Sequence, residues 1–100
     1  MEQAVEVTEN QEARRFEIAV GGRLAGFVKY RRRPGQRVLT HTEIDGEFVG
    51  RGLGGRLVGA ALDAARGAGV KVVPLCPFVA KYVERHPEYR DVIAEESGDA

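Results

Sequence analysis

The sequence predicts an α+β fold in which a mixed sheet of about five strands is joined to two helices. In the first half, apolar and polar residues alternate between short glycine-containing turns, as in half-buried antiparallel strands. In the middle, a run of glycines leads directly into an amphipathic helix, and a short apolar run and a second helical segment follow. The predicted order is therefore four antiparallel strands, a glycine loop, a helix, a fifth strand and a second helix, in a single domain (residues 1–100).

Turn signals separate the strands that precede the glycine loop. Gly21-Gly22 is a two-residue hairpin signal, and Pro34-Gly35 turns the chain again. The basic run Arg31–Arg33 comes just before this second turn, where it is either a solvated charge run or a contact for a cofactor phosphate. The four strands are predicted at Val5–Val7, Phe16–Val20, Leu24–Tyr30 and Arg37–Ile44.

The fourth predicted strand brings candidate catalytic residues to one end of the sheet. Strict alternation places Leu39, His41 and Glu43 on one face of this strand. Cys76, the only cysteine, comes at the end of the fifth strand, Val70–Leu75. If these two strands are neighbours, His41 or Glu43 and Cys76 flank the mouth of one cleft, where a base and a thiol suit group transfer.

The glycine loop, Val49–Arg56, is the most informative stretch of the chain. Glycine allows turns that other residues avoid, and the first turn of the following helix has unpaired N–H donors and a partial positive charge. Such a helix start favours a phosphate or pyrophosphate ligand. The same glycines also fit a purely structural role, in a tight turn and in close helix packing.

Two other phosphate-binding motifs fit this loop poorly. A P-loop needs a Lys followed by Ser or Thr after its last glycine, and neither follows here. The spacing of Gly50, Gly52 and Gly55 satisfies a dinucleotide-binding fingerprint, but the downstream segment Val70–Cys76 carries no acidic residue.

Punctuating residues set the limits of the later elements. Gly67 or Gly69 ends the helix, because glycine often follows the last helical turn. Pro74 marks the end of the fifth strand or a bulge in it, and the second helix is predicted at Phe78–Arg85. The apolar stripe of the first helix consists of Leu53, Leu57, Val58, Ala61, Leu62 and Ala65.

Charge and composition argue against several classes of protein. Fifteen basic residues balance fifteen acidic ones, whereas nucleic-acid binding usually requires a strongly basic face. No apolar stretch approaches the length of a membrane span, and a single cysteine suggests a reducing compartment. We therefore expect a cytoplasmic protein, monomeric or weakly homodimeric, with no metal site and no nucleic-acid or membrane partner.

Several segments, taken together, resemble one known family. The loop Gly50-Arg51-Gly52-Leu53-Gly54 is similar to the acyl-CoA binding loop of the GCN5-related N-acetyltransferases (GNAT). His41-Thr42-Glu43, the segment Val73–Val79 and the segment Tyr82–Tyr89 are similar to very small, single-domain members of that family. The resemblance covers about residues 5–93, and Val49 departs from it because the wider family has Arg or Gln there.

The resemblance implies an N-acetyltransferase that takes its acetyl group from acetyl-CoA. The fourth and fifth strands then splay apart, the pantetheine arm of coenzyme A inserts between them, and main-chain amides of the loop hold the pyrophosphate. The acceptor site is expected to be open and shallow, and its amine, in a small molecule or a protein, is unknown. The cofactor-binding residues implied are Ile44, Val49, Gly50, Arg51, Gly52, Leu53, Gly54 and Gly55.

Cys76, His41 and Glu43 are the catalytic candidates. The thiol of Cys76 either protonates the leaving thiolate or, activated by His41 or by the start of the second helix, accepts the acetyl group itself. It also suits the role of a small buried apolar residue. His41 or Glu43 is the candidate base for the amine. Two functions compete with transfer: a non-catalytic module that binds coenzyme A or acetyl-CoA, and a small interaction domain with a structural glycine loop.

Overall fold

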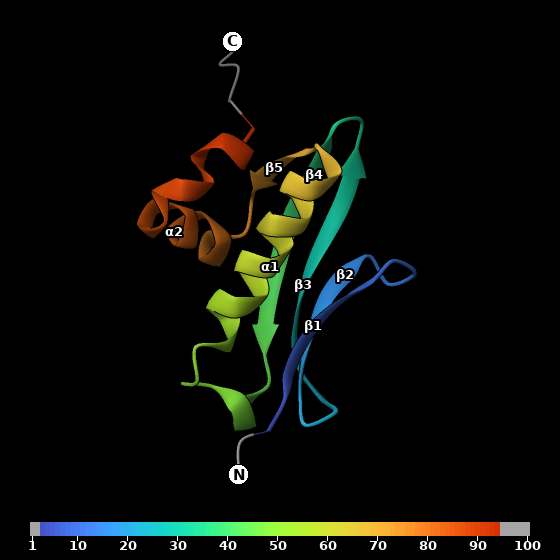
Figure 1. Ribbon diagram of the computed structural model, residues 1–100, viewed down its shortest axis with the longest axis vertical. Helices are drawn as coiled ribbons and strands as arrows, with labels where there is room; N and C mark the ends of the chain where they lie inside the picture. Colours follow the sequence, from blue (N-terminus) through green and yellow to red (C-terminus); the bar gives the residue numbers. More distant parts are fainter. Residues whose placement is uncertain (1–2, 95–100) are drawn as a thin grey trace.

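The computed structural model describes residues 3–94, which form a single sheet with its helices packed against one face (Figure 1). The order of strands across the sheet is the order along the chain. The strands are β1 (Val5–Asn10), β2 (Arg15–Val20), β3 (Arg23–Arg33), β4 (Gln36–Ile44) and β5 (Lys71–Pro74). The helices are α1 (Leu53–Ala68), α2 (Pro77–Arg85) and the 3₁₀ helices η1 (Gly46–Phe48) and η2 (Pro87–Val92). The predicted α+β fold and order of elements are confirmed.

The first four strands are antiparallel, and β5 adds to β4 in parallel. Arg31–Arg33 extend β3 beyond its predicted end at Tyr30 and pair with the first residues of β4, directly before the Pro34-Gly35 turn. The hairpin that follows lies at the opposite end of α1 from the glycine loop (Figure 1). Because a helix of 16 residues is about 24 Å long, a contact between these arginines and a phosphate at the loop does not fit the structure.

A bulge in β4 overturns part of the predicted alternation. Tyr30 pairs with Leu39 while its neighbour Lys29 pairs with His41, so Thr40 is an extra residue in β4. The side chain of Leu39 is buried in the core and that of His41 is exposed. Leu39 therefore does not share a face with His41 and Glu43, because a bulge resets the two-residue period of a strand.

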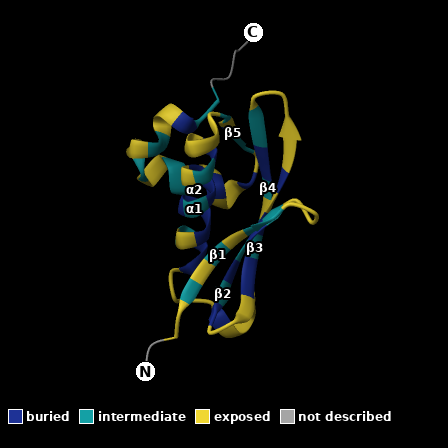
Figure 2. Ribbon diagram, turned by 45° about the vertical axis from the view of Figure 1, so that its right-hand side comes forward, coloured by how far each residue is buried: buried dark blue, intermediate teal, exposed yellow. Residues whose placement is uncertain are grey.

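The core lies between the inner face of the sheet and α1, as Figure 2 shows by its band of buried residues. Every residue of the apolar stripe predicted for α1 is buried. Burial of this stripe fixes the helix across the sheet, since each square ångström of apolar surface removed from water contributes about 25 cal/mol. The sheet residues that it covers include Phe16, Ile18, Val28, Tyr30 and Leu39.

Both ends of α1 are formed by glycines in the left-handed conformation. Gly52 at the start and Gly69 at the end each have φ of 74°, which side chains disfavour. Gly67 lies inside the helix, so of the two predicted ends Gly69 is correct. Pro74 ends β5, as one of the two alternatives predicted.

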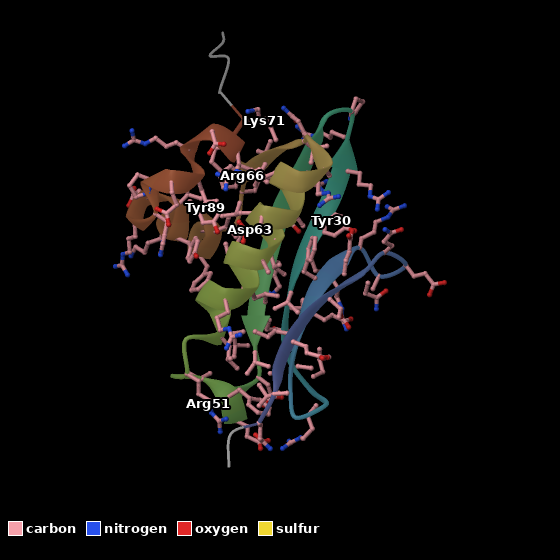
Figure 3. The ribbon with its side chains drawn as sticks, in the orientation of Figure 1. Tyr30, Arg51, Asp63, Arg66, Lys71 and Tyr89 are labelled. Atoms are coloured by element: carbon pink, nitrogen blue, oxygen red, sulfur yellow. The ribbon has the colours of Figure 1, made fainter. Side chains whose placement is uncertain are left out.

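The C-terminal part of the described chain is held against the outer side of α1. The hydroxyl of Tyr89 donates to Asp63 at 2.9 Å, and Arg66 pairs with Asp91 at 2.6 Å (Figure 3). These contacts place η2, and with it the end of α2, beside the helix. None of the helices in the described part of the chain has the length and apolar character needed to cross a membrane.

Candidate active site

The strands β4 and β5 form a fork. They pair only between Gln36–Leu39 and Lys71–Pro74. The last link is the bond from the N–H of Cys76 to the carbonyl of Leu39, at 3.0 Å. Beyond it the chain turns into α2, while β4 continues to Ile44 with no strand from residues 3–94 on that side. The two strands therefore splay apart, as the family resemblance implied, and leave the edge of β4 free.

A cleft of about 380 Å³ opens where β4, the glycine loop and the start of α1 meet. It includes every predicted cofactor-binding residue except Arg51, whose guanidinium lies 5.2 Å from the centre of the Phe48 ring. Arg51 lies at the end of the molecule near the loop (Figure 3). The residues that line the cleft are Thr42, Ile44, Phe48, Val49, Gly50, Gly52, Leu53, Gly54, Gly55 and Phe78.

The start of α1 leaves backbone donors free at this cleft. Gly52 precedes the helix, has no side chain to cap it, and no acidic residue lies in the first turn. The first backbone bond of the helix runs from Arg56 back to Gly52, at 3.3 Å. The N–H groups of Leu53, Gly54 and Gly55 therefore have no partner within the helix. These N–H groups also form the positive end of the helix dipole, so this end of α1 suits an anion.

Cys76 lies at the base of the fork, where β4 parts from β5. Its residue is only 5% exposed, and its sulfur is 3.4 Å from the hydroxyl of Thr42. Burial raises the pKa of the thiol, but hydrogen bonds from Thr42 and from the backbone N–H groups of Val79 and Phe78 lower the pKa by more. The pKa of Cys76 therefore lies below its ordinary value, because the hydrogen bonds favour the thiolate.

His41 and Glu43 lie on the other face of β4. Their side chains are 57% and 61% exposed, and His41 Nε2 is 3.7 Å from Glu43 Oε2. The ring of His41 packs near Phe27 on this outer face, 6.2 Å between ring centres. The predicted cleft with His41 or Glu43 beside Cys76 is therefore wrong in its geometry, and Thr42 takes the place beside the thiol. Activation of Cys76 by direct contact with His41 does not fit this arrangement.

Sequence reasoning missed three residues of the cleft: Thr42, Phe48 and Phe78. Thr42 lines the cleft together with Ile44, and its approach to Cys76 depends on how β5 leads into α2. Phe78 is 46% exposed and its ring covers Gly54, where an added Cβ would lie 2.7 Å from the ring. The Cys-Pro-Phe sequence was a usable signal, since it fixes Phe78 in the first turn of α2.

Among residues 3–94, no three His, Cys, Asp or Glu side chains are grouped so that they could hold a metal ion. The fork itself offers free backbone donors and one thiol of lowered pKa, and a His–Glu pair lies on the outer face of β4.

Three solved structures share this fold. A GCN5-like candidate N-acetyltransferase from Staphylococcus aureus is 24% identical with a TM-score of 0.69, over 89% of this chain and 87% of its own. A ribosomal-protein-alanine N-acetyltransferase from Brucella melitensis biovar Abortus 2308 is 14% identical with a TM-score of 0.58, over 100% of this chain and 96% of its own. An aminoglycoside acetyltransferase from an uncultured soil metagenome, in complex with sisomicin, is 10% identical with a TM-score of 0.53, over 86% of this chain and 62% of its own.

A comparison with proteins of curated function found no significant match. The family profile described as GCN5-related N-acetyl-transferase matches residues 15–92, from the start of β2 to the end of η2. This match spans β2 to β5, the fork, the glycine loop and both α-helices. The chain therefore belongs to the GCN5-related N-acetyltransferase family.

Proposed function

We propose that this protein transfers an acetyl group from acetyl-CoA to an amine. The observation that carries the proposal is the fork, which combines a free edge of β4, free amides at the start of α1 and the thiol of Cys76. The free amides match the phosphates of a phosphorylated carrier, the free edge of β4 matches its long, flexible arm, and the thiol matches the thioester at the end of that arm. A cleft built only for structure would not need all of them together.

The residues of the cleft suit the pyrophosphate and the arm of such a carrier, and Cys76 lies behind Thr42 of the cleft lining. The backbone donors of Leu53, Gly54 and Gly55 suit the pyrophosphate, because they are unpaired and at the positive end of the helix. The side chains of Ile44 and Phe78 supply apolar walls for the arm. The amide groups of the arm would find hydrogen-bond partners along the free edge of β4, as an added strand does.

The transfer is written so that bonds and protons balance. The amine nitrogen attacks the thioester carbon, so that a C–N bond forms and the C–S bond breaks. The thiol of Cys76 donates its proton to the leaving thiolate, and its pKa, lowered below the ordinary value, makes it a competent acid. The proton lost from the amine is taken by the His41–Glu43 pair or by water, and Cys76 regains a proton from solvent.

The two faces of β4 suit the two substrates. Thr42 and Cys76 belong to the inner face, where the carrier would lie, whereas His41 and Glu43 belong to the outer, exposed face. We infer that the amine approaches from this outer face, where a base and a carboxylate are exposed to solvent. His41 would then act on the amine and not on the thiol, which agrees with the absence of contact between His41 and Cys76 among the described residues.

A covalent route is the second candidate, and it rests on the hydrogen bonds that lower the pKa of Cys76. In that route the thiolate attacks the thioester carbon, coenzyme A leaves as the thiolate, and acetyl-Cys76 then passes its acetyl group to the amine. Intact-protein mass spectrometry after incubation with acetyl-CoA and no amine decides between them. An acetyl adduct that Cys76→Ala lacks supports the covalent route, and an unmodified protein that turns over supports direct transfer.

Calorimetric titration with acetyl-CoA tests the proposal as a whole. We expect binding by the wild type and a loss of about 100-fold or more in Gly54→Val, because the added side chain drives the Phe78 ring into the cleft. Gly67→Val is the matched control, since it lies in the same helix and an added Cβ there meets nothing within 4 Å. No binding by the wild type at millimolar acetyl-CoA would exclude the proposed function.

A further inference from the structure

The outer face of the sheet carries a cavity of about 430 Å³ that is separate from the cleft of the fork. It lies between the turn that joins β1 to β2 and the middle of the β3–β4 pair. This turn stands out from the sheet in both ribbon views (Figures 1 and 2). The residues that line the cavity are Ala13, Arg14, Lys29, Tyr30, Arg31 and Thr40.

The position of Lys29 relates this cavity to the candidate base. Lys29 pairs directly with His41 across β3 and β4, and such partners have Cβ atoms about 5 Å apart on one face of a sheet. Phe27, two residues before Lys29, packs near His41 on the outer face. Thr40, which precedes His41, also lines the cavity. The cavity therefore begins beside the base.

Three cations line the cavity, and no acidic side chain does. Arg31 follows Lys29 by two residues on β3, so the two side chains share the outer face. Arg14 comes from the turn, where its carbonyl accepts from the N–H of Tyr30 at 3.0 Å. Its φ of 55° is a conformation that side chains disfavour, and such strain is concentrated at functional sites. Within residues 3–94, none of the three cations takes part in an ion pair.

The outer face is polar in the direction of β4. Glu43 is two residues beyond His41 on β4 and pairs with Phe27, on the side of His41 away from the cavity. A second carboxylate of this face, Glu17, is occupied by Arg15 at 2.8 Å. A carboxylate thus lies on one side of the base and free cations lie on the other. This arrangement suits a molecule with an amine at one end and an anion at the other.

We propose that the acceptor is an amine that also carries a carboxylate or a phosphate, and that Arg14, Lys29 and Arg31 bind this anionic group. The inference rests on the proposed function, since it names the class of amine on which His41 acts. Cations brought together without a counter-ion repel one another, and an anion relieves that repulsion while accepting their hydrogen bonds.

The anion that these cations bind must come from the acceptor and not from the carrier. The hairpin that begins after Arg33 lies at the opposite end of α1 from the glycine loop (Figure 1). Cross-strand neighbours are about 5 Å apart, and successive residues on one face of a strand are about 7 Å apart. The anion would therefore lie about 5–7 Å from the amine at His41, which a short aliphatic chain spans.

Matched pairs of amines test the anionic group separately from the amine. γ-Aminobutyrate is compared with its primary amide, and phosphoethanolamine is compared with ethanolamine, so each pair differs in the anionic group. Acetyl-CoA is the donor, and the release of coenzyme A gives kcat and KM for each amine. The proteins are the wild type, Lys29→Ala/Arg31→Ala, Arg31→Ala and Arg32→Ala.

Arg32→Ala is the matched control for Arg31→Ala. The two arginines are adjacent on β3, but Arg32 belongs to the inner face, where its guanidinium lies 5.9 Å from the centre of the buried Tyr30 ring. Both substitutions remove one charge from an exposed position of the same strand. A thermal melt and a calorimetric titration with acetyl-CoA check that each variant keeps its fold and its donor site.

We expect the kcat/KM of the wild type to be about tenfold higher for the anionic member of at least one pair, with the difference in KM. The pair with the larger ratio identifies the anion as a carboxylate or a phosphate. The double variant should lose the preference, Arg31→Ala should reduce it, and Arg32→Ala should keep it. High salt should also reduce it, because salt screens exposed charges.

The other outcomes overturn the inference and separate it from the proposed function. Equal kcat/KM within both pairs overturns it, while acetyl transfer to amines stands. An equal loss of the preference in Arg31→Ala and Arg32→Ala assigns it to the overall charge of the hairpin, which also overturns it. A wild type that binds acetyl-CoA but acetylates none of the four amines overturns the inference, and one that does not bind acetyl-CoA removes the proposed function as well.

Discussion

The two halves of β4 differ in every respect that matters for function. The first half, Gln36–Leu39, lies between β3 and β5 and is paired on both sides. The second half, from Thr40 to Ile44, is paired with β3 alone and lines the cleft at its inner face. One strand thus provides a rigid anchor at one end and a free edge at the other. The comparison shows that the site arises because β5 pairs with only the first half of β4 and leaves the edge of the second half open.

The same contrast applies to the side chains. Val38 and Leu39 of the paired half are almost completely buried. In the open half, Thr42 contacts the sulfur of Cys76, and His41 and Glu43 are exposed on the outer face. We therefore expect substitutions in the paired half to lower stability and substitutions around the open half to change chemistry.

Cys76→Ala should give the largest effect and should act on chemistry alone. We expect turnover to fall by about 10²–10⁴-fold, as for loss of a positioned acid or nucleophile, while the affinity for acetyl-CoA changes little. Steady-state kinetics and calorimetry measure the two quantities separately. Undiminished turnover would show that the thiol at the base of the fork is only a small buried side chain.

Leu39→Ala should have the next largest effect, and this effect should be on stability alone. Leu39 is 1% exposed in the core, and truncation of a buried leucine costs about 2–5 kcal/mol in the free energy of unfolding. Val49→Ala is the matched truncation at the cleft, where the residue is 65% exposed, and should cost less than about 0.5 kcal/mol. Chemical denaturation measures both, and equal costs would contradict the contrast between the buried anchor of β4 and the exposed lining of the cleft.

Thr42→Val should have the smallest effect and should show in the pH dependence. Its hydroxyl is one of the groups that lower the pKa of Cys76, so its removal should raise that pKa. The thiolate absorbance of the single cysteine follows this titration, because the pKa values of Tyr30 and Tyr82 are raised by burial and that of Tyr89 is raised to about 12.

The direction of the activity change then separates the two roles of the thiol. An acid must be protonated, so activity falls as the pH rises through the pKa of Cys76, and Thr42→Val moves this alkaline limb to higher pH. A nucleophile must be ionised, so activity rises through the same pKa, and the acidic limb moves to higher pH instead. An unchanged thiol titration in Thr42→Val would remove the contact with Thr42 as a cause of the lowered pKa.

The fold was largely predictable because its signals are local. Alternation, turn residues and the apolar stripe of α1 each depend on residues close in sequence, and the structure confirms the order of elements that they predict. The loop Val49–Gly55 was predictable in the same way, since a glycine run before a helix is a continuous signal. Its arrangement around one cleft follows from the start of that helix.

The pairing of catalytic candidates was not predictable from strict alternation. Thr40 is an extra residue in β4, and no single residue type signals such a bulge. The contact between Thr42 and Cys76 joins residues 34 apart in the sequence, and it depends on where β5 ends and α2 begins.

The bulge at Thr40 also links the number of residues in β4 to the opening of the fork between β4 and β5. A bulge bends the strand that carries it and increases its twist, and this one stands at the residue where β4 parts from β5. Deletion of Thr40 would keep Leu39 facing inward and His41 facing outward, because their partners on β3 are themselves adjacent. A single-residue deletion would thus straighten β4 at the point where the fork opens, while every side chain that lines the cleft stays in the sequence.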